Sequence, residues 1–149
     1  MRKSIIAILM GLILIASCKA ADGTEYQVKF GYLTTEDGQK FTFLNESNLV
    51  PLLPISMGAY YGIQIQPSHT LDYSIEIKVH MPNGSSINLP KYTDKGVKVI
   101  PMGFDADDFE GEYKLEIFIN GEKKSSIIFK ALSPKSLSKK IGKVSKEKR

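Results

Sequence analysis

The sequence predicts an all-β domain built as a sandwich of two antiparallel sheets, and three observations support this fold class. Apolar and polar residues alternate with a period of two in several segments between residues 25 and 132. Turn residues separate these segments, and no helical periodicity interrupts them. About seven to eight short strands over roughly a hundred residues are typical of such a sandwich.

The expected strands follow one another at short intervals and form a single domain over residues 25–132, which is long enough to bury a core. The clearest strand covers residues 71–81, where Leu71, Tyr73 and Ile75 begin a run of apolar residues on one side. In chain order we expect strands over residues 26–32, 41–44, 60–66, 71–81, 86–89, 97–102, 113–119 and 127–132.

Asn120-Gly121 is a strong signal for a hairpin between the last two strands. A two-residue turn would put Phe129 on the face opposite to Tyr113, whereas a three-residue loop over 119–121 shifts the register by one and puts both on the core face. We favour the three-residue loop because it buries the larger apolar surface. That register places Ile127 and Phe129 inward and Lys124 and Lys130 outward.

Residues 111–115 resemble the tyrosine corner of immunoglobulin-like domains. Gly111 fits the turn, Tyr113 fits the tyrosine, and Leu115 takes the place of the core cysteine. The resemblance implies an immunoglobulin-like sandwich, with Tyr61 or Tyr73 filling the volume of the missing tryptophan. The alternative is a tyrosine that merely alternates along its strand.

Three segments are also similar to a family of bacterial immunoglobulin-like domains of unknown function. They are a proline–glycine–aromatic entry at residues 54–63, the approach to the corner at 103–105, and the terminal hairpin at 111–129. This family offers no catalytic residues to transfer.

The first 17 residues have the order of a secretory signal peptide. Arg2 and Lys3 precede an apolar core over residues 5–15, and Ala16 and Ser17 are small. The alternative, an uncleaved transmembrane helix, requires about 20 apolar residues, and the run is shorter than that.

Residues 15–18 resemble the lipobox of bacterial lipoproteins, which ends in an obligatory cysteine. The resemblance implies cleavage before Cys18, a lipid on its sulfur, and a tether over residues 18–24 that leads to the domain. We expect no cofactor other than this covalent lipid. The chain has a single cysteine, so it forms no internal disulfide. Lys19 favours the outer membrane, facing the periplasm, in a cell that has one.

Positive charge is concentrated at the two ends of the chain. The domain between residues 19 and 132 has more acids than lysines, which argues against nucleic acid as a partner. The tail over residues 133–149 is Lys-rich, and we expect it to be either disordered or weakly helical. Its cations would bind anionic lipid or a cell-wall polymer: Lys135, Lys139, Lys140, Lys143, Lys146, Lys148 and Arg149.

The chain offers little that suggests catalysis. His69 and His80 have no cysteine partners for a zinc site, and the sequence has no nucleophile elbow and no phosphate-binding loop. One dense acidic cluster is a candidate calcium site, although its spacing departs from an EF-hand and we favour a solvated turn at the sheet corner. It consists of Asp105, Asp107, Asp108 and Glu110.

An apolar segment interrupted by Pro51 and Pro54 is the main candidate for docking a partner protein. Its prolines exclude it from a central strand, so we favour a position over an open sheet edge with the apolar side chains buried. The candidate docking residues are Leu49, Val50, Leu52, Leu53 and Ile55.

Taken together, these patterns predict a membrane-anchored envelope lipoprotein that acts as a non-enzymatic binding or scaffold module. A lipoprotein inhibitor of an envelope-attacking enzyme is one alternative, and it would bind a single enzyme tightly without the lipid. A hydrolase with an unconventional site is the other.

Overall fold

The alternating segments form strands in the computed structural model, which describes residues 23–54, 58, 60–105 and 108–147. Branched and aromatic side chains alternate with polar ones, and such residues pack well on a pleated surface with one buried face. The elements are β1 (Tyr26–Thr34), β2 (Thr42–Glu46), β3 (Leu49–Pro51), β4 (Tyr61–Pro67), β5 (Tyr73–His80), β6 (Ser86–Asn88), β7 (Tyr92–Asp94), β8 (Lys98–Met102), β9 (Gly111–Ile119), β10 (Glu122–Leu132) and α2 (Pro134–Glu147).

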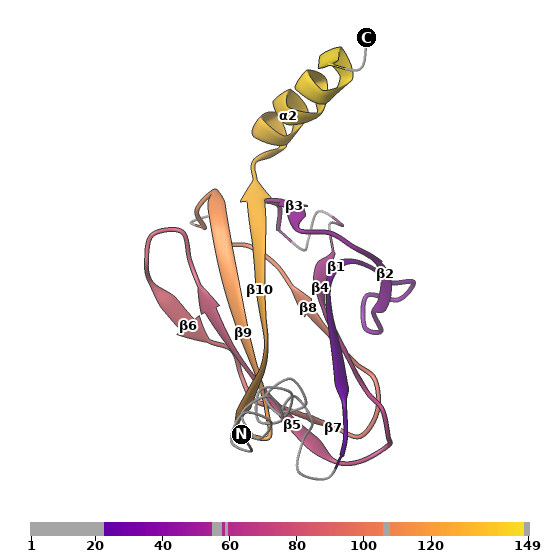
Figure 1. Cartoon of the computed structure of the whole chain (residues 1–149). Helices are drawn as coiled ribbons and strands as arrows, with labels where there is room; N and C mark the ends of the chain where they lie inside the picture. The colour runs from indigo at the N-terminus through magenta and orange to yellow at the C-terminus, as the bar shows by residue number, and fades with distance from the viewer. Residues whose placement is uncertain (1–22, 55–57, 59, 106–107, 148–149) are drawn as a thin grey trace, which may run out of the picture.

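The strands make two sheets that pack face to face, which confirms the predicted sandwich (Figure 1). One sheet has the order β2-β1-β4-β8, and the other has the order β3-β10-β9-β5-β6, with β7 also paired to β5. Every pairing is antiparallel except that of β3 with β10, which is parallel. The buried faces of both sheets supply one apolar core.

The strand order is that of an immunoglobulin-like domain. β1, β4 and β8 take the places of strands A, B and E, and β5, β9 and β10 take those of C, F and G. The corner is also present, because the Tyr113 hydroxyl donates a hydrogen bond to the carbonyl oxygen of Phe109 at 2.6 Å. Leu115 is fully buried two residues later, where many such domains have a cysteine.

Five aromatic rings from both sheets touch in a closed cycle at the corner end of the core. The ring centroids of successive members are 4.4 to 6.2 Å apart. Tyr61 belongs to this cycle, whereas Tyr73 lies at the other end of the domain and packs against Tyr26. Tyr61 thus contributes to the aromatic packing of a domain that has no tryptophan. The members, in order, are Phe30, Tyr61, Phe104, Tyr113 and Phe129.

The three-residue loop predicted for the last hairpin is wrong. Asn120 and Gly121 form a two-residue turn, with positive φ at both positions (51° and 79°), and Ile119 pairs with Glu122. Two residues further on, the register shifts at a bulge between Lys123 and Ser125.

The bulge turns Phe129 toward the core, as the incorrect three-residue loop would have done. Phe129 pairs directly with Tyr113 and is 2% exposed, while Ile128 is 55% exposed on the outer face. The inward position of Phe129 is therefore confirmed. Lys130 is exposed as expected, but the side chain of Lys124, the extra residue of the bulge, is only 10% exposed, so its outward position was wrong.

Two short strands, β3 and β7, were not predicted from the sequence, because each pairs with a strand that is distant in the chain. β3 lies along β10, and β7 pairs with the first half of β5 while β6 pairs with the second half. Between them, Leu89 donates its N–H to the carbonyl of Ile77, and Pro90 has no N–H to extend the pairing. The long strand β5 is thus covered by two short edge pieces rather than one.

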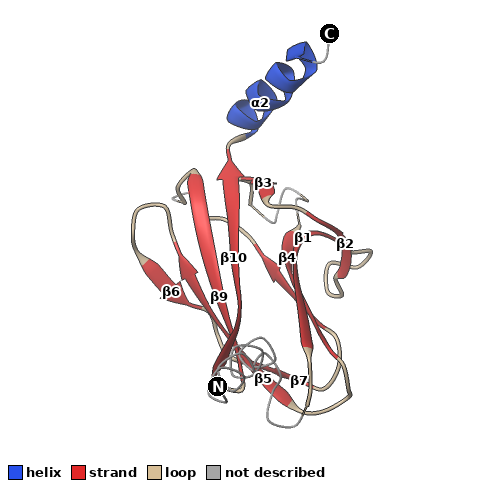
Figure 2. Cartoon of the chain, viewed as in Figure 1, coloured by secondary structure: helices blue, strands red, loops and turns tan. Residues whose placement is uncertain are grey.

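The start of β1 and the end of β10 lie at opposite ends of the domain (Figure 1). β1 starts where Tyr26 pairs with Pro67, near Tyr73, whereas β10 ends beside Pro51 and Gly111. Helix α2 follows β10 and projects from that second end, away from the start of β1 (Figures 1 and 2). Of the two states expected for the tail, the structure shows the helix.

Candidate functional site

Several predicted site residues lie outside the described residues. These are the signal peptide over residues 1–17, Cys18, Ile55, Asp107, Lys148 and Arg149. Among the helices that are described, none combines the length and apolar character needed to span a bilayer. The predicted site residues that the structure describes lie in three places: the basic helix α2, the acidic corner loop before β9, and the apolar segment at the edge of β10.

Helix α2 begins with a well-formed cap. Ser133 precedes Pro134, a residue suited to the first helical position, and the Ser133 hydroxyl accepts the N–H of Ser136 at 3.2 Å. The Glu110 carboxylate accepts the N–H of Ser133 at 2.9 Å, so it lies at the positive end of the helix dipole. Hydrogen bonds from Ser136 and Ser133 hold the pKa of Glu110 below its usual value.

The cap assigns a role to part of the acidic cluster. Glu110 connects the corner to the helix, and Asp108 accepts the N–H of Asp105 at 2.5 Å within the corner loop. In the part of the chain that the structure describes, no three His, Cys, Asp or Glu side chains are placed to hold a metal ion. Calcium binding here remains an untested prediction.

Four lysines of α2 lie in solvent. Lys135, Lys139, Lys140 and Lys143 are all exposed, while Leu137 is half-buried. Lys135, Lys139 and Lys143 are spaced by four residues, which aligns them along one side of a helix. The helical state therefore gathers cations that a disordered tail would leave scattered.

The apolar segment after β2 covers the edge of β10. Val50 is fully buried in the core, and Leu49 and Leu52 are half-buried, as is Leu53. Leu52 continues the edge pairing by donating its N–H to Leu132 at 2.7 Å. The position over a sheet edge agrees with the expectation, while a docking role remains a prediction.

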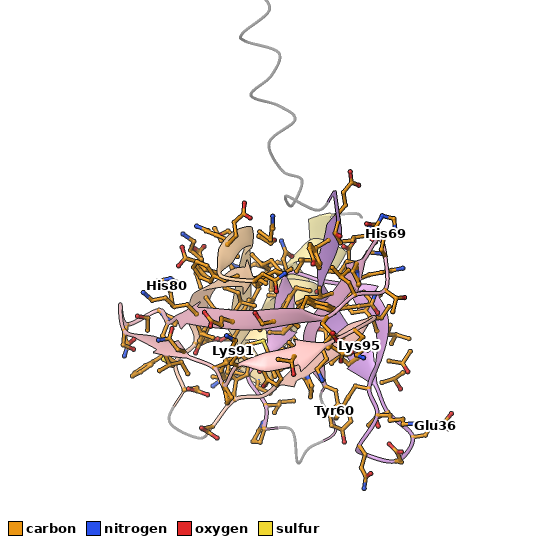
Figure 3. All side chains as sticks on the ribbon, turned by 90° about the horizontal axis from the view of Figure 1, so that it is seen from below. Glu36, Tyr60, His69, His80, Lys91 and Lys95 are labelled. Carbon is orange, nitrogen blue, oxygen red and sulfur yellow. The ribbon has the colours of Figure 1, made fainter. Side chains whose placement is uncertain are left out.

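A cluster of basic side chains around Glu116 was not anticipated from the sequence. The Glu116 side chain, 17% exposed, lies 2.9 Å from His80 Nε2, 3.0 Å from Lys123 Nζ and 3.6 Å from Lys114 Nζ. His80 lies on β5 and Lys123 on β10, so the pairing of these strands with β9 brings both side chains to Glu116. Lys114 precedes Glu116 by two residues on β9 itself. His69 lies far from His80, on the other side of the domain, and Figure 3 shows the separation.

Glu116 should make the stability of the domain depend on acidity. Hydrogen bonds from His80 and then Lys123 lower the pKa of Glu116 from 4.5 to about 2. The folded state therefore binds this proton less readily than the unfolded chain, and the stabilisation present above about pH 4.5 is lost as the pH falls toward 2. Thermal unfolding of Glu116→Gln should differ from that of the unmodified chain at pH 7, and the difference should shrink toward pH 2.

Glu112→Gln is the matched control, because it removes an exposed carboxylate from the same face of β9. Its unfolding should follow the unmodified chain across the whole range. If the melting temperatures of Glu116→Gln and Glu112→Gln changed with pH in the same way, Glu116 would have no special role in the pH dependence of stability.

The sequence matches no protein-family model and no curated protein. Among solved structures, the chain is similar to an immunoglobulin-like protein from Pseudomonas aeruginosa, with 16% identity and a TM-score of 0.43, over 72% of this chain and 97% of the other. It is also similar to the Pseudomonas fluorescens alkylpurine DNA glycosylase AlkC, solved bound to DNA containing an abasic site analog. That match has 12% identity and a TM-score of 0.38, and it covers 71% of this chain and 30% of the glycosylase. Both TM-scores are below 0.5, so the immunoglobulin-like class rests on the strand order and the tyrosine corner described above.

Proposed function

We propose that this protein is a lipoprotein of the cell envelope, held in a membrane by a lipid on Cys18. The observation that carries the proposal is the lipobox-like sequence over residues 15–18, directly after an apolar signal core. Two or more acyl chains are needed for stable anchoring, and the lipoprotein modification supplies them. With Lys19 after the cysteine, we place the anchor in the outer membrane, facing the periplasm, where the cell has one.

Within the envelope, we assign the sandwich a non-enzymatic binding or scaffold role. A short tether over residues 18–24 leads into a β1 that is hydrogen-bonded on both sides, to β2 and to β4. A domain held in this way has a fixed end near the membrane and presents its remaining loops and the helix to other envelope components. A scaffold domain binds other molecules through its surface, and the exposed lysines of α2 supply a surface that can bind anionic ones.

Substituting the anchor residue tests the proposal. Cys18→Ser should leave a precursor with its signal peptide attached and no lipid, because the serine hydroxyl cannot replace the thiolate as the acyl-accepting nucleophile. Metabolic labelling with a radioactive fatty acid, together with the size of the product, measures both steps. Lys19→Ser, one residue along, is the control and should be labelled and processed normally. Lipid labelling of Cys18→Ser itself would refute the lipoprotein assignment.

A further inference from the structure

Helix α2 presents a row of exposed lysines. Lys135, Lys139 and Lys143 are exposed and follow one another at four-residue intervals, which is about 6 Å per step along the axis. Among the side chains that the structure describes, no carboxylate lies within 4 Å of these three ammonium groups or of Lys140. None of the described side chains therefore neutralises the positive charge of this row.

The cap makes this row a lasting feature of the surface. The Ser133 hydroxyl accepts the N–H of Ser136 in the first turn of α2. The Glu110 carboxylate accepts the N–H of Ser133 just before the helix, so it bonds to the cap and not to a lysine. The cap also joins the helix to the corner loop of the sandwich. A row of charges that is already ordered loses less conformational entropy when it binds than lysines in a flexible tail would lose.

The arrangement of the helix favours a linear polyanion over a lipid surface. An interfacial helix inserts its apolar side and keeps cations beside the headgroups. Here Leu137 is two positions from Lys135 and from Lys139, so it lies on the opposite side of the helix, and it is already half-buried. Because this apolar side is already partly covered, it has less surface to insert into a bilayer, whereas a polymer with regular negative charges can run along the exposed lysine row.

The position of the helix also favours a polyanion over the membrane surface, if the chain is held by the proposed lipid anchor. The tether enters at the start of β1, and α2 leaves from the opposite end of the sandwich (Figure 1). A nine-residue strand such as β1 spans about 30 Å. We propose that α2 binds a linear anionic polymer of the cell envelope, at a distance of about 30 Å or more from the membrane that holds the lipid.

Binding of inorganic polyphosphate by the full chain in a neutral detergent tests this inference. Replacing Lys135, Lys139 and Lys143 together by Gln should weaken binding on the order of tenfold and lower the salt dependence of the binding constant by about two logarithmic units per decade of salt. The control replaces three exposed lysines of the sandwich by Gln, which changes the net charge equally: Lys40, Lys91 and Lys95. The control should bind within about twofold of the unmodified chain.

A second variant separates charge from helix formation. Gly142→Ala raises the helix propensity at an exposed position with open space, so it should leave polyphosphate binding equal or tighter. Equal losses in the two lysine triples would show general charge attraction and overturn the inference. Binding to phosphatidylglycerol vesicles without binding to polyphosphate would overturn it in favour of a membrane target. Because Cys18 labelling is measured separately, failure of the lipid anchor and failure of polymer binding can be told apart.

Discussion

Replacing Phe129 by Ala should lower the free energy of unfolding by about 3–5 kcal/mol. Phe129 is 2% exposed, and its ring stacks on Phe30 and Tyr113, with centroids 4.4 and 5.3 Å away. The substitution removes the transfer free energy of the ring and opens a cavity between the two sheets, because the rings of the aromatic cycle come from five different parts of the chain and cannot all collapse inward. Urea unfolding of the full chain in a neutral detergent measures the change.

Ile128→Ala is the matched control for Phe129→Ala. Ile128 is the preceding residue of β10 and is 55% exposed on the outer face, so its loss should change the free energy of unfolding by less than about 1 kcal/mol. If the two substitutions had equal effects, or if Ile128→Ala had the larger one, the register of the terminal hairpin would be wrong.

Gly62→Ala should cost about 3 kcal/mol and should loosen the pairing of β4 with β8. A Cβ at Gly62 would overlap the carbonyl oxygen of Ile100 and lie 3.0 Å from the Cα of Pro101. Both are backbone atoms of the neighbouring strand, so no side-chain rotation relieves the overlap. β4 is held between β1 and β8 and cannot shift without disturbing both pairings.

Gly96→Ala adds the same methyl group where no atom lies within 4 Å, and serves as the control. Its unfolding free energy should stay within about 0.5 kcal/mol of the unmodified chain. Hydrogen exchange of the amides of β8 provides a second measurement, and faster exchange should appear in Gly62→Ala alone. Full stability of Gly62→Ala would contradict the close approach of the two strands.

The sequence predicted the strands best where alternation was long. Residues 71–81 contain β5, and residues 113–119 coincide with most of β9, because a buried face imposes its period of two whatever the partner strand is. The tyrosine corner was also readable, since Tyr113 bonds to Phe109 only four residues away. The close backbone approach at Gly62 was not predicted, although a glycine inside a strand can mark such a contact.

Features that depend on contacts between residues distant in the chain could not be predicted from periodicity or local motifs. Asn120-Gly121 specified the turn type correctly by its conformational preference, but the bulge at Lys124 depends on how β10 packs against the whole core. The parallel pairing of β3 with β10 requires strands that are far apart in the chain. The contacts of His80 and Lys123 with Glu116 likewise depend on residues distant in the sequence or placed by the bulged hairpin.

The sequence alone thus determined the all-β class, the corner and the basic character of the tail, because each follows from residue periodicity, local hydrogen bonding or composition. Only the tertiary structure decided which strands share a sheet and where α2 leaves the domain. The same structure brought Glu110 to the start of that helix, where it accepts the N–H of Ser133. The physical reason is that these features are contacts between residues distant in the chain, whose geometry is fixed by packing the two sheets into one core.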